Sequence, residues 1–216
     1  MPKTISDIYA EYRVMPNLQL HMLRVASVAS LIADNYTEPL DKNTLIASCL
    51  LHDVGNMVRL QLEVFPEFNE PQGIEYWREV KNDYIERYGK DDHLANIKIL
   101  REIGLSEEII EIAGGNTPKL VCKFAKEDNL LLKVEFYADA RVSPHGVLSY
   151  EDRQAESTKR YANVEGSLPA LERKQMVDCG KDIEIEIFAK CRIKPEDIND
   201  ESIKTIMEEL RHFVIK

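Results

Sequence analysis

The sequence predicts an all-α protein, and three observations support that fold class. Apolar residues recur at helical spacing along most of the 216 residues, no segment shows the pattern of a strong strand, and glycines and prolines separate the periodic segments. The length suits one compact domain, and a hydrophobic content of 44% provides for a sizeable core. We therefore expect a helical protein without internal repeats.

Apolar faces and end signals mark the predicted helices of the first half. Residues 18–34 carry an apolar stripe at intervals of three and four residues. Asp41 is the expected N-cap of the next helix, and Gly55 ends that helix soon after a His-Asp pair. Prolines and a glycine within residues 57–73 predict a loop with one short turn of helix. The expected helices are residues 18–34, 41–52, 74–88 and 91–103.

Helix-breaking residues and acidic first turns mark the helices of the second half. Ser106 and the two acidic residues after it begin one helix, which Gly114 ends. The stretch VSPHG, residues 142–146, breaks another. The tail from about residue 165 is more charged, and we expect it to form helices joined around Pro195. The expected helices are residues 106–113, 127–141, 149–162, about 168–191 and about 199–214.

Charge and cysteine content narrow the class of protein. A formal net charge of −10 argues against a partner that is a nucleic acid polymer or an anionic membrane, but a small phosphorylated ligand needs only a local cluster of cations. No segment reaches the ~18 apolar residues of a membrane span and the N-terminus lacks a signal-peptide run, so we expect a cytoplasmic protein. Four cysteines without a C-x-x-C pair are expected to be buried, reduced thiols: Cys49, Cys122, Cys179 and Cys191.

Several side chains that can bind metals are predicted to point toward the core. His21, His93 and Asp139 each fall in register with apolar residues of their own helix, and His52 and Asp53 end a further helix. Each alone is most simply a hydrogen-bonded core residue or a cap. Together they would bury uncompensated charge unless a cation lay among them. Mixed imidazole and carboxylate ligands suit Mn, Fe, Co, Ni or Zn.

The same residues carry a resemblance to a known family. The stretches LQLHMLRVA, ASCLLHDVGN and VEFYADARVSP resemble the H…HD…D signature of the HD superfamily of metal-dependent phosphohydrolases. The resemblance covers about residues 15–145. We expect one HD-type domain over residues 1–216, with a C-terminal helical extension from about residue 165 to residue 216.

This resemblance implies a helical bundle around a metal centre. The implied ligands of a divalent transition-metal ion are His21, His52, Asp53 and Asp139. The implied reaction is hydrolysis of a phosphoester in a small phosphorylated metabolite, with a nucleotide expected, by a metal-activated water. Asp53 would orient that water or bridge to a second metal.

Two departures from the family pattern bear on the chemistry. Members with two metals have further His ligands, and His93 stands at the first of these positions while Asn116 stands near the next. A second metal would therefore bind weakly, and His93 is alternatively a general acid or a phosphate contact. Asn56 replaces the acid or lysine that some members carry three residues after the HD aspartate.

Nearby cations are the expected substrate contacts, together with the neutral Asn56. Arg24 follows His21 by three residues, Arg141 follows Asp139 by two, and Arg153 lies on the next helix. For Arg141 the competing interpretation is a structural pair with a carboxylate such as Glu151 or Asp152. His145 and His212 are given no role.

Four functional hypotheses remain open from the sequence. The leading one is a metal-dependent phosphohydrolase of the HD superfamily. The second is a two-metal phosphodiesterase or dinucleoside-polyphosphate hydrolase, and the third is a non-catalytic domain that senses a nucleotide. The fourth is a helical protein whose inward polar residues only form hydrogen bonds. The amphipathic tail could support a homodimer.

Overall fold

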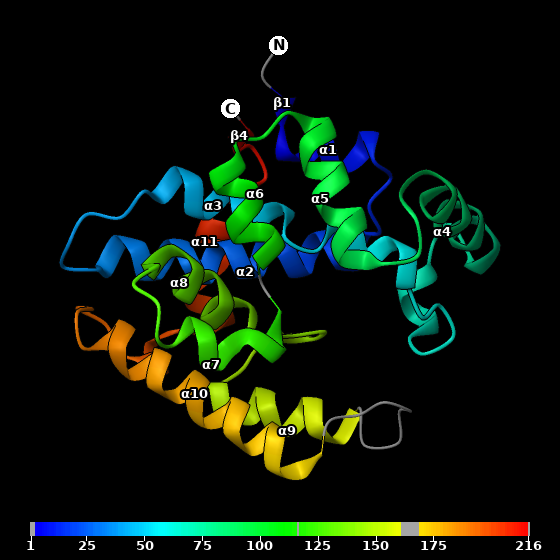
Figure 1. Cartoon of the computed structure of the whole chain (residues 1–216). Helices are drawn as coiled ribbons and strands as arrows, with labels where there is room; N and C mark the ends of the chain where they lie inside the picture. The colour runs from blue at the N-terminus through cyan, green and yellow to red at the C-terminus, as the bar shows by residue number, and fades with distance from the viewer. Residues whose placement is uncertain (1–2, 116, 161–168, 216) are drawn as a thin grey trace.

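The computed structural model describes residues 3–115, 117–160 and 169–215, and helices make up most of it (Figure 1). This confirms the all-α prediction. The helices are α1 (Ile5–Glu11), α2 (Pro16–Asn35), α3 (Lys42–Leu51), α4 (Ile74–Tyr88), α5 (Asp92–Ile103), α6 (Glu107–Gly115), α7 (Val121–Phe124), α8 (Leu130–Asp139), α9 (Tyr150–Arg160), α10 (Ala170–Phe188) and α11 (Asp200–Leu210).

Short turns and strands connect these helices. The 3₁₀ turns are η1 (Val54–Arg59), η2 (Pro66–Asn69), η3 (Pro118–Leu120) and η4 (Pro195–Asp197). The strands are β1 (Lys3–Thr4), β2 (Val142–Ser143), β3 (Gly146–Val147) and β4 (Val214–Ile215). The sequence analysis predicted neither α1 nor the strands. Each strand has only two residues, so it shows no alternation of apolar and polar residues.

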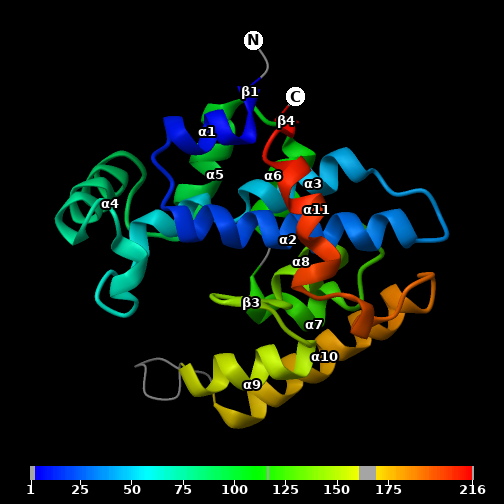
Figure 2. The ribbon, with the colours of Figure 1, turned by 180° about the vertical axis from the view of Figure 1, so that it is seen from behind.

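Helix α2 runs through the centre of the molecule, with α3, α8 and α11 packed around it (Figures 1 and 2). Pro16 at its first position is suited to a helix start, since a helix leaves that N–H unpaired anyway. Its buried residues lie on more than one face and include Met22, Val25, Ala29 and Ile32. A helix that is apolar on several sides belongs in a core, and this placement fixes the position of His21.

The segment after α3 packs closely against α5. Asp41 caps the start of α3 as predicted, with its carboxylate accepting from the Thr44 N–H at 3.1 Å. A Cβ atom at Gly55 would lie 2.1 Å from the backbone oxygen of Asp92 on α5. Glycine at position 55 therefore permits a contact between η1 and α5 that no other residue could make without a shift.

The C-terminal residues wrap back onto the rest of the chain. Helices α9 and α10 lie side by side at one end, while α11 crosses α2 (Figure 2). Strand β4 pairs with β1 in antiparallel register, Lys3 opposite Ile215, so both ends of the described chain meet. Apolar residues of α10 and α11, among them Ile187 and Ile203, belong to the same buried core as those of the earlier helices.

The expectation of four reduced cysteines is wrong for two of them. Cys122 on α7 and Cys179 on α10 form a disulfide across a sequence separation of 57 residues. Cys49 is buried and free, and Cys191 is half-buried and free. The pairing depends on how α10 packs against α7, and no spacing motif in the sequence signals it.

Within the described ranges, none of the helices combines the length and apolar character needed to cross a membrane.

Candidate metal centre

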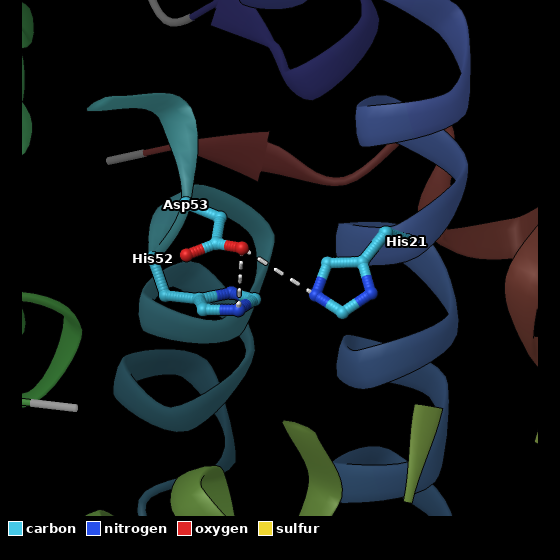
Figure 3. A group of neighbouring side chains, drawn as sticks. All are labelled: His21, His52 and Asp53. Atoms are coloured by element: carbon cyan, nitrogen blue, oxygen red, sulfur yellow. Dashed lines mark ion pairs between the residues drawn. The ribbon is translucent and has the colours of Figure 1, made fainter. Parts of the chain in front are cut away.

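Two segments bring three metal-competent side chains together (Figure 3). His21 lies on α2, His52 follows the last residue of α3, and Asp53 comes next in the chain. Their ligand atoms all lie within 4.8 Å of one another. The Asp53 carboxylate faces both rings, with Oδ2 3.6 Å from His21 Nε2 and 3.8 Å from His52 Nε2.

Asp139 reaches the same place from the end of α8. Its Oδ1 atom lies 3.1 Å from His21 Nε2 and 3.6 Å from His52 Nε2. The structure therefore brings together all four residues that the resemblance implied as ligands. They come from positions 21, 52, 53 and 139, and the packing of α3 and α8 against α2 makes them neighbours.

A backbone hydrogen bond fixes the tautomer of His52. Its Nδ1 atom lies 2.9 Å from the Cys49 carbonyl, which can only accept, so Nδ1 carries a proton and donates it. In the neutral ring the other nitrogen, Nε2, then has a free lone pair. Nε2 is buried and has no hydrogen-bond partner within the residues the structure describes. Such an arrangement is typical of a histidine that ligates a metal.

The charges of the cluster attract a cation. Burial alone lowers the pKa of His52, but the Asp53 and Asp139 carboxylates outweigh burial and raise that pKa to about 10. Partial burial opposes ionisation of Asp139, yet the neighbouring imidazoles of His21 and His52 hold its pKa well below the usual range. Two carboxylates beside two imidazoles are a donor set that fits a divalent transition-metal ion.

Two buried residues around the cluster escaped the sequence analysis. Asn96 on α5 donates from Nδ2 to the His52 carbonyl at 2.7 Å and accepts from the Gly55 N–H at 2.9 Å, so it holds the turn around Asp53. Glu135, one turn before Asp139 on α8, is fully buried and its charge also raises the pKa of His52. Each was detectable as a polar residue in register with apolar neighbours.

His93 lies outside this cluster, contrary to the expected inward orientation. His93 is in the first turn of α5, and its side chain is exposed although Asn96 and Leu100 further along the helix are buried. Its Nε2 atom is 3.4 Å from the Thr117 hydroxyl. The other residue considered for a second metal, Asn116, lies outside the described residues.

The three arginines that were predicted to contact substrate all contact other groups of the protein. Arg24 Nε lies 3.7 Å from Asp200 Oδ1. Arg153 donates from Nε to the Val142 carbonyl at 2.7 Å and pairs with Glu156 at 3.0 Å. Arg141 is 2% exposed and its donors reach oxygen atoms of the protein, which favours a structural role.

Asn56, a further predicted substrate contact, borders a cavity. It lies in η1, three residues after Asp53, and helps to line a hollow of about 400 Å³.

Comparison with known proteins identifies one family. The family model described as HD domain matches residues 19–140, which is more than half of the chain and includes all four clustered residues. No curated protein and no solved structure gives a significant match.

Proposed function

Because the chain belongs to the HD-domain family, we propose that it is a metal-dependent phosphohydrolase that cleaves a phosphoester bond in a small phosphorylated metabolite. A nucleotide is the substrate class we expect. One observation carries the proposal: His21, His52 and Asp53 form a single group of ligand atoms. Asp139 lies against both imidazoles of that group.

The four side chains would hold one divalent ion, with Mn, Fe, Co, Ni and Zn as the candidates. When bound, the ion would act as a Lewis acid that polarises a phosphoryl oxygen and makes an attacking water more acidic. The Asp53 side chain is 29% exposed, so substrate and water can reach its carboxylate. We assign to Asp53 the orientation of that water and the uptake of its proton.

The residues around the ligands support this role by holding them rigidly. The Cys49 carbonyl orients the His52 ring, and Asn96 fixes the backbone on both sides of Asp53. Ligands positioned by such outer contacts keep their geometry when substrate binds. We assign no step to His93, because it does not belong to the group of ligand atoms.

The one-metal hydrolase is preferred to the other hypotheses. A two-metal phosphodiesterase or dinucleoside-polyphosphate hydrolase needs further ligands, and His93 lies outside the cluster. A domain that only senses nucleotides would have little need of a complete ligand set, and here the set is complete.

Metal content and hydrolysis test the proposal together. We expect about one transition-metal ion per purified chain by elemental analysis, and phosphate release from a panel of mononucleotides in Mn²⁺ or Co²⁺. Asp53→Asn keeps the size of the side chain and removes its charge. This variant should lose the bound metal and at least about 100-fold in rate.

His212→Gln is the matched control, because it removes an exposed histidine far along the chain from all four ligands. It should retain both metal and rate. Full hydrolysis by metal-free protein, or unchanged metal content in Asp53→Asn, would contradict the proposal.

A further inference from the structure

The disulfide between Cys122 and Cys179 joins a short core helix to a long helix near the surface. Cys122 lies on α7, whose residues Val121 and Phe124 are buried. Cys179 lies near the middle of α10. Both cysteines are half-buried, so neither is enclosed in the core as Cys49 is. Disulfides that solvent can reach are the ones that exchange most readily with small thiols.

The first half of α10 is loosely packed, and so is α9 beside it (Figures 1 and 2). We call these two segments the arm, residues 150–160 and 170–179. Tyr150 is the one buried residue of the arm, whose residues the structure describes throughout. Met176 and Val177 are half-buried against the core. A segment that buries so little apolar surface opens easily.

The second half of α10 is anchored by packing. Ile183 and Ile187 are both fully buried in the core. Between them, Glu184 accepts a hydrogen bond from the Tyr137 hydroxyl of α8 at 2.6 Å. The disulfide therefore lies at the boundary between the half of α10 that packing holds in place and the half that it does not.

The noncovalent contacts of the arm are mainly polar. Lys174 pairs with Asp178 at 2.6 Å inside the arm, and both side chains are more than half exposed, so the pair adds little stability. Arg153 donates from Nε to the Val142 carbonyl at 2.7 Å, which links the arm to the strand that follows Asp139. The covalent bond to α7 is thus the strongest connection between the first half of α10 and the core.

We propose that the Cys122–Cys179 disulfide is a redox switch: glutathione reduces it in the folded protein, and reduction releases the arm from α7. The thiolate of one glutathione attacks a sulfur of the pair, which breaks the S–S bond, frees one cysteine and leaves a mixed disulfide. A second glutathione thiolate attacks the mixed disulfide and frees the other cysteine. The two glutathione thiols supply two electrons and two protons, and they leave as one glutathione disulfide.

Alkylation of the folded protein tests the first half of the proposal. The protein is first oxidised with glutathione disulfide and then incubated, without denaturant, in millimolar reduced glutathione. Mass spectrometry should find no label on Cys122 and Cys179 before this incubation and label on both after it. Cys49 should stay unlabelled throughout, because it is buried.

Hydrogen exchange of the backbone amides tests the second half. In the reduced protein, amides of the arm should exchange at least about tenfold faster than in the oxidised protein. Amides of residues 181–188, in the anchored half of α10, should exchange at the same rate in both states. So should those of α5, which does not touch the disulfide.

Two variants make the result specific to this pair. The double variant Cys122→Ser/Cys179→Ser should exchange rapidly in the arm under both conditions, since it cannot form the bond. Cys191→Ser removes a free thiol and should keep the full response to glutathione. If the double variant does not fold, the comparison of oxidised and reduced native protein still decides the question.

The measurements need neither metal nor substrate, so they are independent of the proposed hydrolysis. Release confined to the arm, together with label on both cysteines, would support the switch even if no phosphoester were cleaved. A pair that glutathione leaves intact in the folded protein would overturn the proposal. Unchanged exchange after reduction would also overturn it, and so would faster exchange throughout the chain, because the disulfide would then only stabilise the whole fold.

Discussion

The guanidinium of Arg141 is almost fully buried, and its donors end on neutral oxygens. Nη1 donates to the Tyr137 hydroxyl at 2.6 Å, and Nη2 donates to the Ile198 carbonyl at 2.9 Å. Nε donates to the Leu148 carbonyl. The Tyr137 hydroxyl in turn donates to Glu184 at 2.6 Å, which places a negative charge one hydrogen bond away. Arg141 thus joins the end of α8 to the segment between β3 and α9 and to the segment just before α11.

Replacement of Arg141 should therefore destabilise the fold. Arg141→Met keeps much of the side-chain volume but leaves several buried acceptors without a donor. We expect the free energy of unfolding to fall by about 2–4 kcal/mol, measured by chemical denaturation. Arg78→Met removes an exposed arginine that pairs with Glu75 and should cause no measurable loss. Unchanged stability together with a raised KM would instead indicate a substrate contact.

The residues of the candidate site were predictable where helical register decided their direction. His21 and Asp139 share faces with apolar residues, and both lie in the cluster. His93 shares a stripe with Leu100, which is buried, but His93 lies in the first turn of α5 and its own side chain is exposed. The contacts of Arg24 with Asp200 and of Arg141 with Ile198 were not predictable, because these partners lie far away in the sequence.

At the scale of elements, most helix boundaries followed from capping residues and glycines. Helix α4 spans the predicted residues 74–88, where Gly73 and Gly89 bound it. The hairpin of β2 and β3 and the contact between α7 and α10 were missed. Both depend on pairing between segments, which local sequence signals do not encode.

The disulfide between α7 and α10 should stabilise the fold. It closes a loop with a sequence separation of 57 residues, so its loss in the double variant Cys122→Ser/Cys179→Ser should lower the free energy of unfolding by about 2–4 kcal/mol. Chemical denaturation measures this change. Cys191→Ser, which removes a free thiol, is the control and should have a much smaller effect.

Alkylation of the unfolded protein checks the pairing directly. Without reduction, mass spectrometry should find label only on Cys49 and Cys191, and after reduction on all four cysteines. Label on Cys122 before reduction would show that the disulfide does not form. Disulfides persist mainly in oxidising compartments. If this pair is found as a disulfide in cells, that result would argue against the expected cytoplasmic location.

At the scale of the whole molecule, the C-terminal residues complete structures that begin elsewhere. Lys133 on α8 is buried and pairs with Glu186 of α10 at 2.7 Å. Asp200 on α11 accepts from the Val147 N–H at 3.2 Å and lies near Arg24. We therefore propose that residues 1–216 fold as one unit, and that the family match over residues 19–140 covers a part which is not stable alone.

A chain cut after residue 160 tests that proposal. It lacks six apolar residues that lie in the core: Ile183, Ile187, Ile198, Ile203, Leu210 and Ile215. At about 1.5–3 kcal/mol for each buried side chain, their loss removes at least about 9 kcal/mol. Whole domains are stable by only about 5–15 kcal/mol. Residues 1–160 should therefore show no cooperative thermal transition by circular dichroism.

Co-expression supplies the control for this experiment. Residues 169–216 produced beside residues 1–160 should restore a cooperative transition, because they return both the apolar side chains and the partners of Lys133 and Arg141. A cooperative transition of residues 1–160 alone, near the temperature of the full chain, would mean that the HD core is autonomous. In that case the buried C-terminal contacts would add little to its stability, and the estimate from buried apolar surface would fail for this protein.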